Sequence, residues 1–467
     1  MTDRSDALVL FGGTGDLAQR KLYPALYELA RAGRLPARVV AVAASEWTLE
    51  ELQERVESSI ERFGGRADDR DALQRLLGAL DYVAGDYRDA ATFEQLATAL
   101  GDSERPLLYL AIPPSLFEAV IAGLDRAGIA ERGRVVLEKP FGRDLASARE
   151  LNRCVLAAFD ESSVFRIDHF LGKDQVLDVL VFRLANSLLE PAWNRHHIAS
   201  VQITMAESLD VEGRGAFYDE VGTLRDVVQN HLLQVLTLVA MEPPVDSSAD
   251  ALRDEKVKVL RAIPALDPAQ LVRGQYVGYR DEGGVAADSE VETYVALTTT
   301  IESWRWAGVP FSIRAGKALA STATEVVVEF ERPPLQFFVR CDAPPPEPNR
   351  LRFQIKPGGE VGLQVQIKAP GGEMVSHPVE LSYRYDDRVE GTREEAYARL
   401  LDDALDGDQR LFARADGVEE AWRVVAPVLD SLEPVHPYER GTWGPEEADR
   451  LLPEGGAWHV PEVASDG

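Results

Sequence analysis

The chain has 467 residues, of which 45% are hydrophobic and 27% charged, and its formal net charge at pH 7 is −28. This length predicts two or three domains of ordinary soluble composition. The negative charge argues against nucleic acids and anionic membranes as partners, because both would be repelled. No apolar run is long enough to span a bilayer, and the N-terminal apolar run is too short for a signal peptide. Two cysteines, Cys154 and Cys341, are too few for a disulfide framework and predict a cytoplasmic protein.

The first part of the chain alternates short apolar runs with helical patterns. Residues 7–11 predict a strand buried on both faces, and a glycine turn at 12–16 leads into a helix that ends at Gly33. A second helix is expected after Thr48, which is a good N-cap residue. Further strands are expected at 37–45, 80–86, 106–114 and 133–142. Strands alternating with helices predict an α/β domain with a parallel, doubly wound sheet.

From about residue 198 the pattern becomes rich in β-strands. Strands are expected at 198–209, 291–303, 311–316, 324–333, 350–358, 362–371 and 379–387. Several of them alternate polar and apolar residues, which is typical of an antiparallel sheet with one solvated face. Helical blocks are expected at 222–241 and 394–432. We therefore divide the chain into a first domain at 1–175 and a larger β+α domain at 176–467.

The glycine turn has the context that a dinucleotide site requires. Gly12, Gly13 and Gly15 follow a predicted strand and precede a predicted helix. Glycines let the backbone approach a pyrophosphate, and the start of the helix offers N–H groups and a positive dipole. A tight turn without a ligand is the alternative. At the end of the second strand Glu46 could accept a hydrogen bond from a ribose 2′-OH, and no arginine follows Ala43 to favour a 2′-phosphate.

Lysine is rare in this chain. Only eight of the 50 basic residues are lysines: Lys21, Lys139, Lys173, Lys256, Lys258, Lys317, Lys356 and Lys368. A compact ammonium that approaches a reacting oxygen cannot be replaced by a guanidinium, so lysines beside Gly, Pro or His are candidates for ligand binding. In the segment RIDHFLGKD, His169 and Lys173 are four residues apart. Either a helix or a turn through Gly172 could aim both at one anion.

Together the motifs resemble the glucose-6-phosphate dehydrogenase family. The matching segments keep the family's order over roughly residues 10–422 and include FGGTGDLAQRKLYPAL, AIPPSLF, EKPFGRDL, RIDHFLGKD, VEGRGAFYDEVGTLRDVVQNHLLQ, PFSIRAGKAL and EEAYARLLDDALDGDQRLF. The resemblance implies a Rossmann-like dinucleotide-binding domain and a larger β+α domain, with an antiparallel sheet, that binds substrate and forms a homodimer or homotetramer. It also implies oxidation of C1 of glucose 6-phosphate to a δ-lactone with reduction of NADP, in the pentose phosphate pathway and without a metal.

The reaction needs a general base near neutral pKa, and imidazole is the natural one. His169 and His231 compete for this role. The resemblance assigns it to His231, with Asp168 as the carboxylate that orients it, and gives His169 and Lys173 to the sugar phosphate. The other substrate contacts that it implies are Lys139, Glu207, Asp226 and Lys317. The cofactor contacts that it implies are Gly12, Gly13, Thr14, Gly15, Asp16, Leu17, Lys21, Ser45, Pro113 and Lys139.

Local sequence alone leaves other interpretations of these residues open. His231 could be a core histidine, and Glu207 and Lys317 could form surface salt bridges. On an α-helix Asp226, five residues before His231, lies about half a turn off its face. Pro140 after Lys139 is a candidate for a cis peptide bond.

Three positions depart from the family pattern. Most relatives have tyrosine in place of Phe170, many have a basic residue in place of Thr322, and those that prefer NADP have arginine in place of Ala44. The first two predict weaker phosphate binding, since losing one charged contact costs roughly a factor of 10–100 in affinity. The third makes NAD a plausible cofactor beside NADP. Alternatives are a dehydrogenase for another sugar or sugar phosphate, and a non-catalytic dinucleotide-binding subunit.

Overall fold

The computed structural model describes residues 4–64, 68–211, 213–335, 337–338, 346–385, 396–431 and 433–461. The chain forms two compact units, each made of three segments. Unit 1 comprises residues 1–173, 244–254 and 392–419, and unit 2 comprises residues 174–243, 255–391 and 420–467. The expected division of binding roles at residue 175 stays a prediction.

The sequence predicted that the cysteines form no disulfide framework and that no segment spans a membrane. Cys154 is a free, half-buried thiol, and Cys341 lies outside the described residues. None of the helices in the described ranges is long and apolar enough to cross a membrane.

Unit 1 is built on a six-stranded parallel sheet with the order β3-β2-β1-β4-β5-β6. Its strands are β1 (Ala7–Phe11), β2 (Arg38–Ala43), β3 (Leu80–Ala84), β4 (Pro106–Leu110), β5 (Arg134–Leu137) and β6 (Val164–Arg166). All residues of β1 and β4 are buried, which explains their continuous apolar sequences. The predicted parallel sheet is confirmed. Its strand order reverses between β1 and β4, where ligands bind in sheets of this kind.

Helices pack around this sheet, and α1, α2, α3 and α11 contribute to one buried apolar cluster with it. They are α1 (Tyr23–Arg31), α2 (Leu49–Phe63), α3 (Arg70–Ala79), α4 (Ala90–Leu100), α5 (Phe117–Arg126), α6 (Leu145–Ala158) and α11 (Ala396–Asp406). Thr48 caps α2 as predicted, because its hydroxyl accepts from Glu51 N at 3.2 Å and Glu51 returns a bond to Thr48 N at 2.8 Å.

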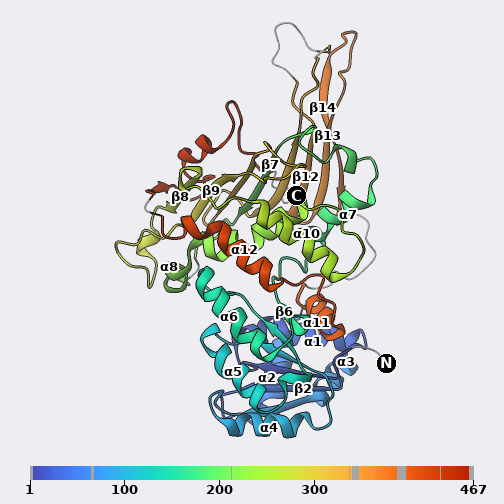
Figure 1. Cartoon of the computed structure of the whole chain (residues 1–467), viewed down its shortest axis with the longest axis vertical. Coiled ribbons are helices and arrows are strands. Elements are labelled where there is room, and N and C mark those ends of the chain that lie inside the picture. Colours follow the sequence, from blue (N-terminus) through green and yellow to red (C-terminus); the bar gives the residue numbers. More distant parts are fainter. Residues whose placement is uncertain are drawn as a thin grey trace. The chain divides into compact units, whose positions relative to one another are not determined.

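Helix α11 joins unit 1 from far along the sequence. Its residues Leu400, Leu401 and Leu405 belong to the same buried cluster as Leu22 and Leu26. In Figure 1 the orange α11 lies beside the blue α1. The sequence pattern placed this helical block with the second half of the chain, because periodicity does not reveal the surface against which a helix packs.

Unit 2 contains a nine-stranded sheet with the order β14-β13-β12-β11-β7-β10-β9-β8-β15. Its strands are β7 (Ile198–Ala206), β8 (Leu271–Tyr276), β9 (Tyr294–Thr299), β10 (Phe311–Gly316), β11 (Ala323–Phe330), β12 (Arg350–Lys356), β13 (Glu360–Lys368), β14 (Ser376–Arg384) and β15 (Val435–Tyr438). Most neighbours are antiparallel, as predicted, but β7 pairs with β10 and β8 with β15 in parallel. The long chain segments between these partners allow the crossover that a parallel pair needs.

The helices of unit 2 are α7 (Asp174–Ala185), α8 (Gly215–Thr223), the π-helix η6 (Leu224–Leu232) and α9 (Leu233–Ala240). Two further helices, α10 (Ala249–Ala262) and α12 (Ala415–Val425), carry residues assigned to both units. The helix predicted at 222–241 is therefore present, but Gly222 breaks its start with a φ of +68° and its first turns are π-helical. A second π-helical segment, η1 (Ala18–Leu22), precedes α1.

Candidate active site

The glycine turn lies at the switch point between β1 and β4. Gly12 has a φ of +83°, and a Cβ there would lie 2.3 Å from the carbonyl oxygen of Ala111. A Cβ on Gly13 would lie 2.6 Å from the Cβ of Ala41. Both positions therefore require glycine, because the ends of β2 and β4 crowd the turn from two sides.

Side chains beside this turn offer hydroxyl groups at the edge of the sheet. The Thr14 and Ser45 hydroxyl oxygens are 3.1 Å apart, and the Tyr82 hydroxyl donates to the Ser45 carbonyl at 2.5 Å. The turn and the end of β2 thus lie side by side, which fits a dinucleotide that extends from its pyrophosphate to a ribose. Sequence reasoning missed Tyr82.

The other cofactor candidates differ in exposure. Lys21 and Pro113 are exposed, and Leu17 packs partly against the core of unit 1. Asp16 is exposed and paired with Arg20, whose Nε lies 2.8 Å from the Asp16 carboxylate. This ion pair within one helical turn was not predicted.

Lys139 follows β5 at the carboxyl edge of the same sheet. The Lys139–Pro140 peptide bond is cis, which the sequence had suggested for Pro140. The preceding residue, Glu138, accepts a hydrogen bond from the Tyr109 hydroxyl at 2.5 Å. Neither Glu138 nor Tyr109 was singled out from the sequence.

The segment that follows β6 is a compact turn rather than a helix. The buried Asp168 accepts from Phe170 N through its side chain at 2.9 Å and from Leu171 N through its carbonyl at 3.0 Å. Lys173 N then donates to the Phe170 carbonyl at 3.2 Å. This decides between the two conformations that the spacing of His169 and Lys173 left open.

Aromatic rings contact the two phosphate-binding candidates of this turn, His169 and Lys173. The His169 ring stacks on Tyr397 of α11 with centroids 6.2 Å apart and an interplanar angle of 8°. The Lys173 Nζ lies 3.7 Å from the centroid of the buried Phe170 ring. Burial raises the pKa of Tyr397, so its phenol stays protonated. Sequence reasoning missed Tyr397 because only the fold brings α11 to this turn.

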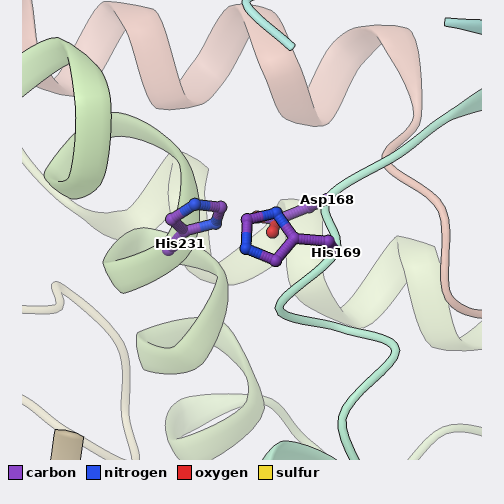
Figure 2. Close-up of side chains that lie close together, drawn as sticks. All are labelled: Asp168, His169 and His231. Carbon is purple, nitrogen blue, oxygen red and sulfur yellow. The ribbon is translucent and has the colours of Figure 1, made fainter. Parts of the chain in front are cut away.

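Helix η6 carries the candidate base His231 together with Asp226. Figure 2 shows the His231 ring on this helical segment, and the Asp168 and His169 side chains on the coil after β6. His231 is buried and Asp226 is half-buried. In a π-helix the i→i+5 hydrogen bonds bring residues five apart close to one side. The expected offset of half a turn between Asp226 and His231 assumed an α-helix, whereas this segment is a π-helix. The roles of the two residues stay predictions.

A buried carboxylate holds the start of η6. Glu292 accepts from Leu224 N through its side chain and from Thr223 N through its carbonyl, both at 3.1 Å. The guanidinium of Arg273 lies 3.4 Å from the other Glu292 oxygen. A Cβ on Gly222 would meet Glu292 at 2.6 Å, so glycine is required beside it. These contacts hold the start of the segment that carries His231, and no sequence motif pointed to Glu292.

Glu207 and Lys317 lie together because they follow two parallel neighbouring strands. Ala206 ends β7 opposite Gly316 at the end of β10, and Glu207 N donates to the Gly316 carbonyl at 3.0 Å. The Lys317 ammonium forms an ion pair with the Glu207 carboxylate. Lys317 is buried, whereas the Glu207 side chain is 39% exposed, so the pair reaches the surface on the Glu207 side.

Two further side chains adjoin this pair. The Tyr218 ring centroid is 5.6 Å from the Lys317 Nζ, and the Tyr218 hydroxyl lies 2.8 Å from that of Thr223. Thr322 accepts a hydrogen bond from Ser208 N at 3.0 Å. Thr322, at which the resemblance led us to expect a basic side chain, thus contacts the segment directly after Glu207.

Comparisons with known proteins cover both halves of the chain. The family described as "Glucose-6-phosphate dehydrogenase, NAD binding domain" matches residues 9–178, and "Glucose-6-phosphate dehydrogenase, C-terminal domain" matches residues 180–459. Glucose-6-phosphate 1-dehydrogenase 1 of Mycobacterium tuberculosis is 46% identical over 98% of this chain and 97% of its own length. The corresponding enzyme of Dickeya dadantii is 40% identical over 97% of this chain and 98% of its own length.

Solved structures give the same result. A glucose-6-phosphate 1-dehydrogenase from Mycobacterium avium superposes with a TM-score of 0.91 at 46% identity, over 99% of this chain and 100% of that one. A glucose-6-phosphate dehydrogenase in complex with its substrate glucose-6-phosphate has a TM-score of 0.91 at 35% identity, with the same coverage. With both domains matched over almost the full length, the chain belongs to the glucose-6-phosphate dehydrogenase family.

Proposed function

We propose that this protein is a glucose-6-phosphate 1-dehydrogenase, which oxidises C1 of glucose 6-phosphate to the δ-lactone with NADP as the acceptor. The observation that carries this proposal is the match of both domains to one family over nearly the whole chain. The candidate residues support it, because Lys139, Glu207 and Lys317 follow the ends of strands and His231 lies on a helix held by buried contacts. We place the reaction in the cytoplasmic pentose phosphate pathway.

His231 is proposed as the general base that takes the proton from O1 of the sugar. It is buried, and η6 is fixed by Glu292, so the imidazole is held without much freedom. The Asp168 carboxylate would stabilise the imidazolium that forms, as in other acid–histidine dyads. A nicotinamide cofactor bound at the glycine turn accepts the hydride from C1.

The remaining charged residues are proposed to hold the substrate in place. Glu207, Lys317 and Asp226 suit the sugar hydroxyls, since carboxylates accept from them and an ammonium donates to them. His169 and Lys173 suit the phosphate, because charge-assisted hydrogen bonds to phosphate are strong. Lys139 stands at the carboxyl end of β5, where it would serve both sugar and cofactor.

We infer that NAD is also used. Ala44 and Glu46 are both exposed after β2. The adenosine ribose of a bound cofactor would therefore lie near the Glu46 carboxylate, with alanine in place of an arginine at position 44. A carboxylate there suits the two hydroxyls of NAD better than the 2′-phosphate of NADP.

We also infer that the protein forms a homodimer through the outer strands of unit 2. β13 and β14 form a long hairpin (Figure 1), and three apolar side chains on it, Ile367, Leu381 and Tyr383, are each about half exposed or more. A second copy of this chain is the partner expected for such a patch.

The test is to assay the purified protein with glucose 6-phosphate and with glucose, each with NADP and with NAD, following the reduced nicotinamide. Reduction of NADP with glucose 6-phosphate is expected to be the fastest. If neither cofactor is reduced with the phosphate ester, the proposal is wrong. A preference for the phosphate ester of less than about tenfold would favour a dehydrogenase for another sugar, the alternative that Phe170 and Thr322 raise. Light scattering would check the dimer.

A further inference from the structure

One carboxylate at the edge of the unit 1 sheet has no part in the proposed chemistry. Glu138 follows β5 directly, and Tyr109 belongs to the neighbouring strand β4. The Tyr109 hydroxyl is fully buried and donates to the Glu138 Oε1 at 2.5 Å. Glu138 therefore stands between the buried sheet and Lys139, which the reaction is proposed to use.

We propose that Glu138 is a positioning residue for Lys139, and that its ionised form is the one that supports the reaction. An adjacent carboxylate attracts the Lys139 ammonium and restricts where it points. The hydrogen bond from Tyr109 holds the Glu138 carboxylate in place. Through Glu138, strand β4 therefore influences the position of the Lys139 ammonium. The inference rests on the proposed function in assigning Lys139 to sugar and cofactor.

Four charged or titratable groups surround Glu138, each from a different element. They are Tyr109 on β4, Lys139 beyond β5, Asp168 after β6 and Tyr397 on α11. Burial raises the pKa of Glu138 to about 7, and the Asp168 charge acts in the same direction. The Tyr109 hydrogen bond, the Lys139 charge and the Lys139 N–H oppose this rise. The carboxyl group therefore changes charge within the range in which such enzymes work.

The sign of the pH dependence follows from these contacts. Below pH 7 Glu138 is protonated and attracts Lys139 weakly, and above pH 7 it is ionised. A Glu138→Gln variant resembles the protonated form at every pH. We expect its kcat/KM to equal the wild-type value near pH 6 and to be about tenfold lower near pH 9, the size of one charged contact. Glu118→Gln, an exposed glutamate of unit 1, is the matched control and should follow the wild type throughout.

Tyr109→Phe tests the mechanism of this effect. Losing the phenolic hydrogen bond removes a contact that lowers the pKa of Glu138. In Tyr109→Phe the midpoint of the rise of kcat/KM with pH should therefore lie at a higher pH than in the wild type. The kcat/KM reached at high pH should be the same in both. A ratio of Glu138→Gln to wild type that stays constant from pH 6 to pH 9 would mean a structural role only and would overturn the proposal.

A second readout does not depend on turnover. The infrared band of protonated carboxylic acids should lose intensity as the ligand-free protein is titrated through about pH 7, because burial raises the pKa of both Glu138 and Asp403 to about 7. In Glu138→Gln this loss should be smaller by the share of one carboxyl group. If the loss is equal in the wild type and in Glu138→Gln, the proposal fails even when the enzyme is active. If the two differ as expected but the wild type oxidises no sugar, the proposed function fails instead, so the two failures are distinguishable.

Discussion

The two units present their lysines in different surroundings. In unit 2, Lys317 is buried and ion-paired with Glu207 at the ends of two parallel strands. In unit 1, Lys173 lies on a turn with its ammonium 3.7 Å from the Phe170 ring centroid. An aromatic ring attracts a cation through its quadrupole but carries no net charge, so this contact does not neutralise the ammonium.

This difference matches the two ends of the proposed substrate. Sugar hydroxyls are uncharged, and a neutral lysine–carboxylate pair offers them both a donor and an acceptor. A phosphate is an anion, and an ammonium binds it through charge-assisted hydrogen bonds. In a protein with a net charge of −28, such local positive charge is needed to bind an anion at all. We therefore expect the loss of Lys173 to affect phosphate affinity and the loss of Lys317 to affect the reaction of any sugar.

The largest effect is expected for the base in unit 2. His231→Asn should lower kcat by about 10²–10⁴-fold and change KM little, because general base catalysis contributes that much. His436→Asn is the matched control, since this half-buried histidine of the same unit pairs with Glu447 at 3.1 Å. Steady-state kinetics with glucose 6-phosphate and NADP would measure both. Full turnover by His231→Asn would move the role of base to another residue, with His169 the first candidate.

Replacing the two lysines tests the comparison directly. Lys173→Ala should raise KM for glucose 6-phosphate by about 10–100-fold and leave the slow reaction with glucose unchanged. Lys317→Ala should lower kcat/KM for both sugars by a similar factor, because it acts on hydroxyls that both share. The ratio of kcat/KM for the two sugars is therefore the measurement. If both variants change this ratio equally, the assignment of Lys173 to the phosphate and of Lys317 to the sugar hydroxyls is wrong.

The sequence predicted the parts of the site that depend on local order. The glycine turn, the strand before it and the Thr48 cap are all set by residues close in the chain, and each was found as predicted. Glu207 and Lys317 could be identified from the family's motifs. The parallel pairing of β7 with β10 that joins them could not, because register between distant strands leaves no local signal.

Several of the contacts that sequence reasoning missed join residues far apart in the chain. Tyr397 reaches His169 only because α11 packs on unit 1. Glu292, which binds the start of η6, follows it by more than sixty residues in the chain. The π-helical hydrogen bonding of η6 was also missed, because its apolar pattern resembles that of an ordinary helix. Such features depend on tertiary packing, which a single sequence does not display.

A smaller effect is expected at the cofactor end of unit 1. Ala44→Arg places a guanidinium at an exposed position after β2, where it can pair with a 2′-phosphate. The ratio of kcat/KM for NADP to that for NAD should rise by about tenfold, and Ala44→Gln, which adds length without charge, should change it little. A ratio that is equal in both variants would show that the ribose end of the cofactor lies elsewhere.

The smallest change should come from Phe170→Tyr. This variant keeps the ring next to Lys173 and adds only a hydroxyl group. The added hydroxyl could reach the phosphate, and one such hydrogen bond lowers KM for glucose 6-phosphate by about twofold to tenfold. Phe170→Leu removes the ring and the cation–π contact with it, so it should raise the same KM. Glucose as substrate should respond to neither variant. If Phe170→Tyr instead weakens binding of the phosphate ester, the hydroxyl has met buried apolar surroundings at this position, which is only 5% exposed. In that case Lys173 and His169, rather than a phenol, must supply the phosphate affinity of this protein.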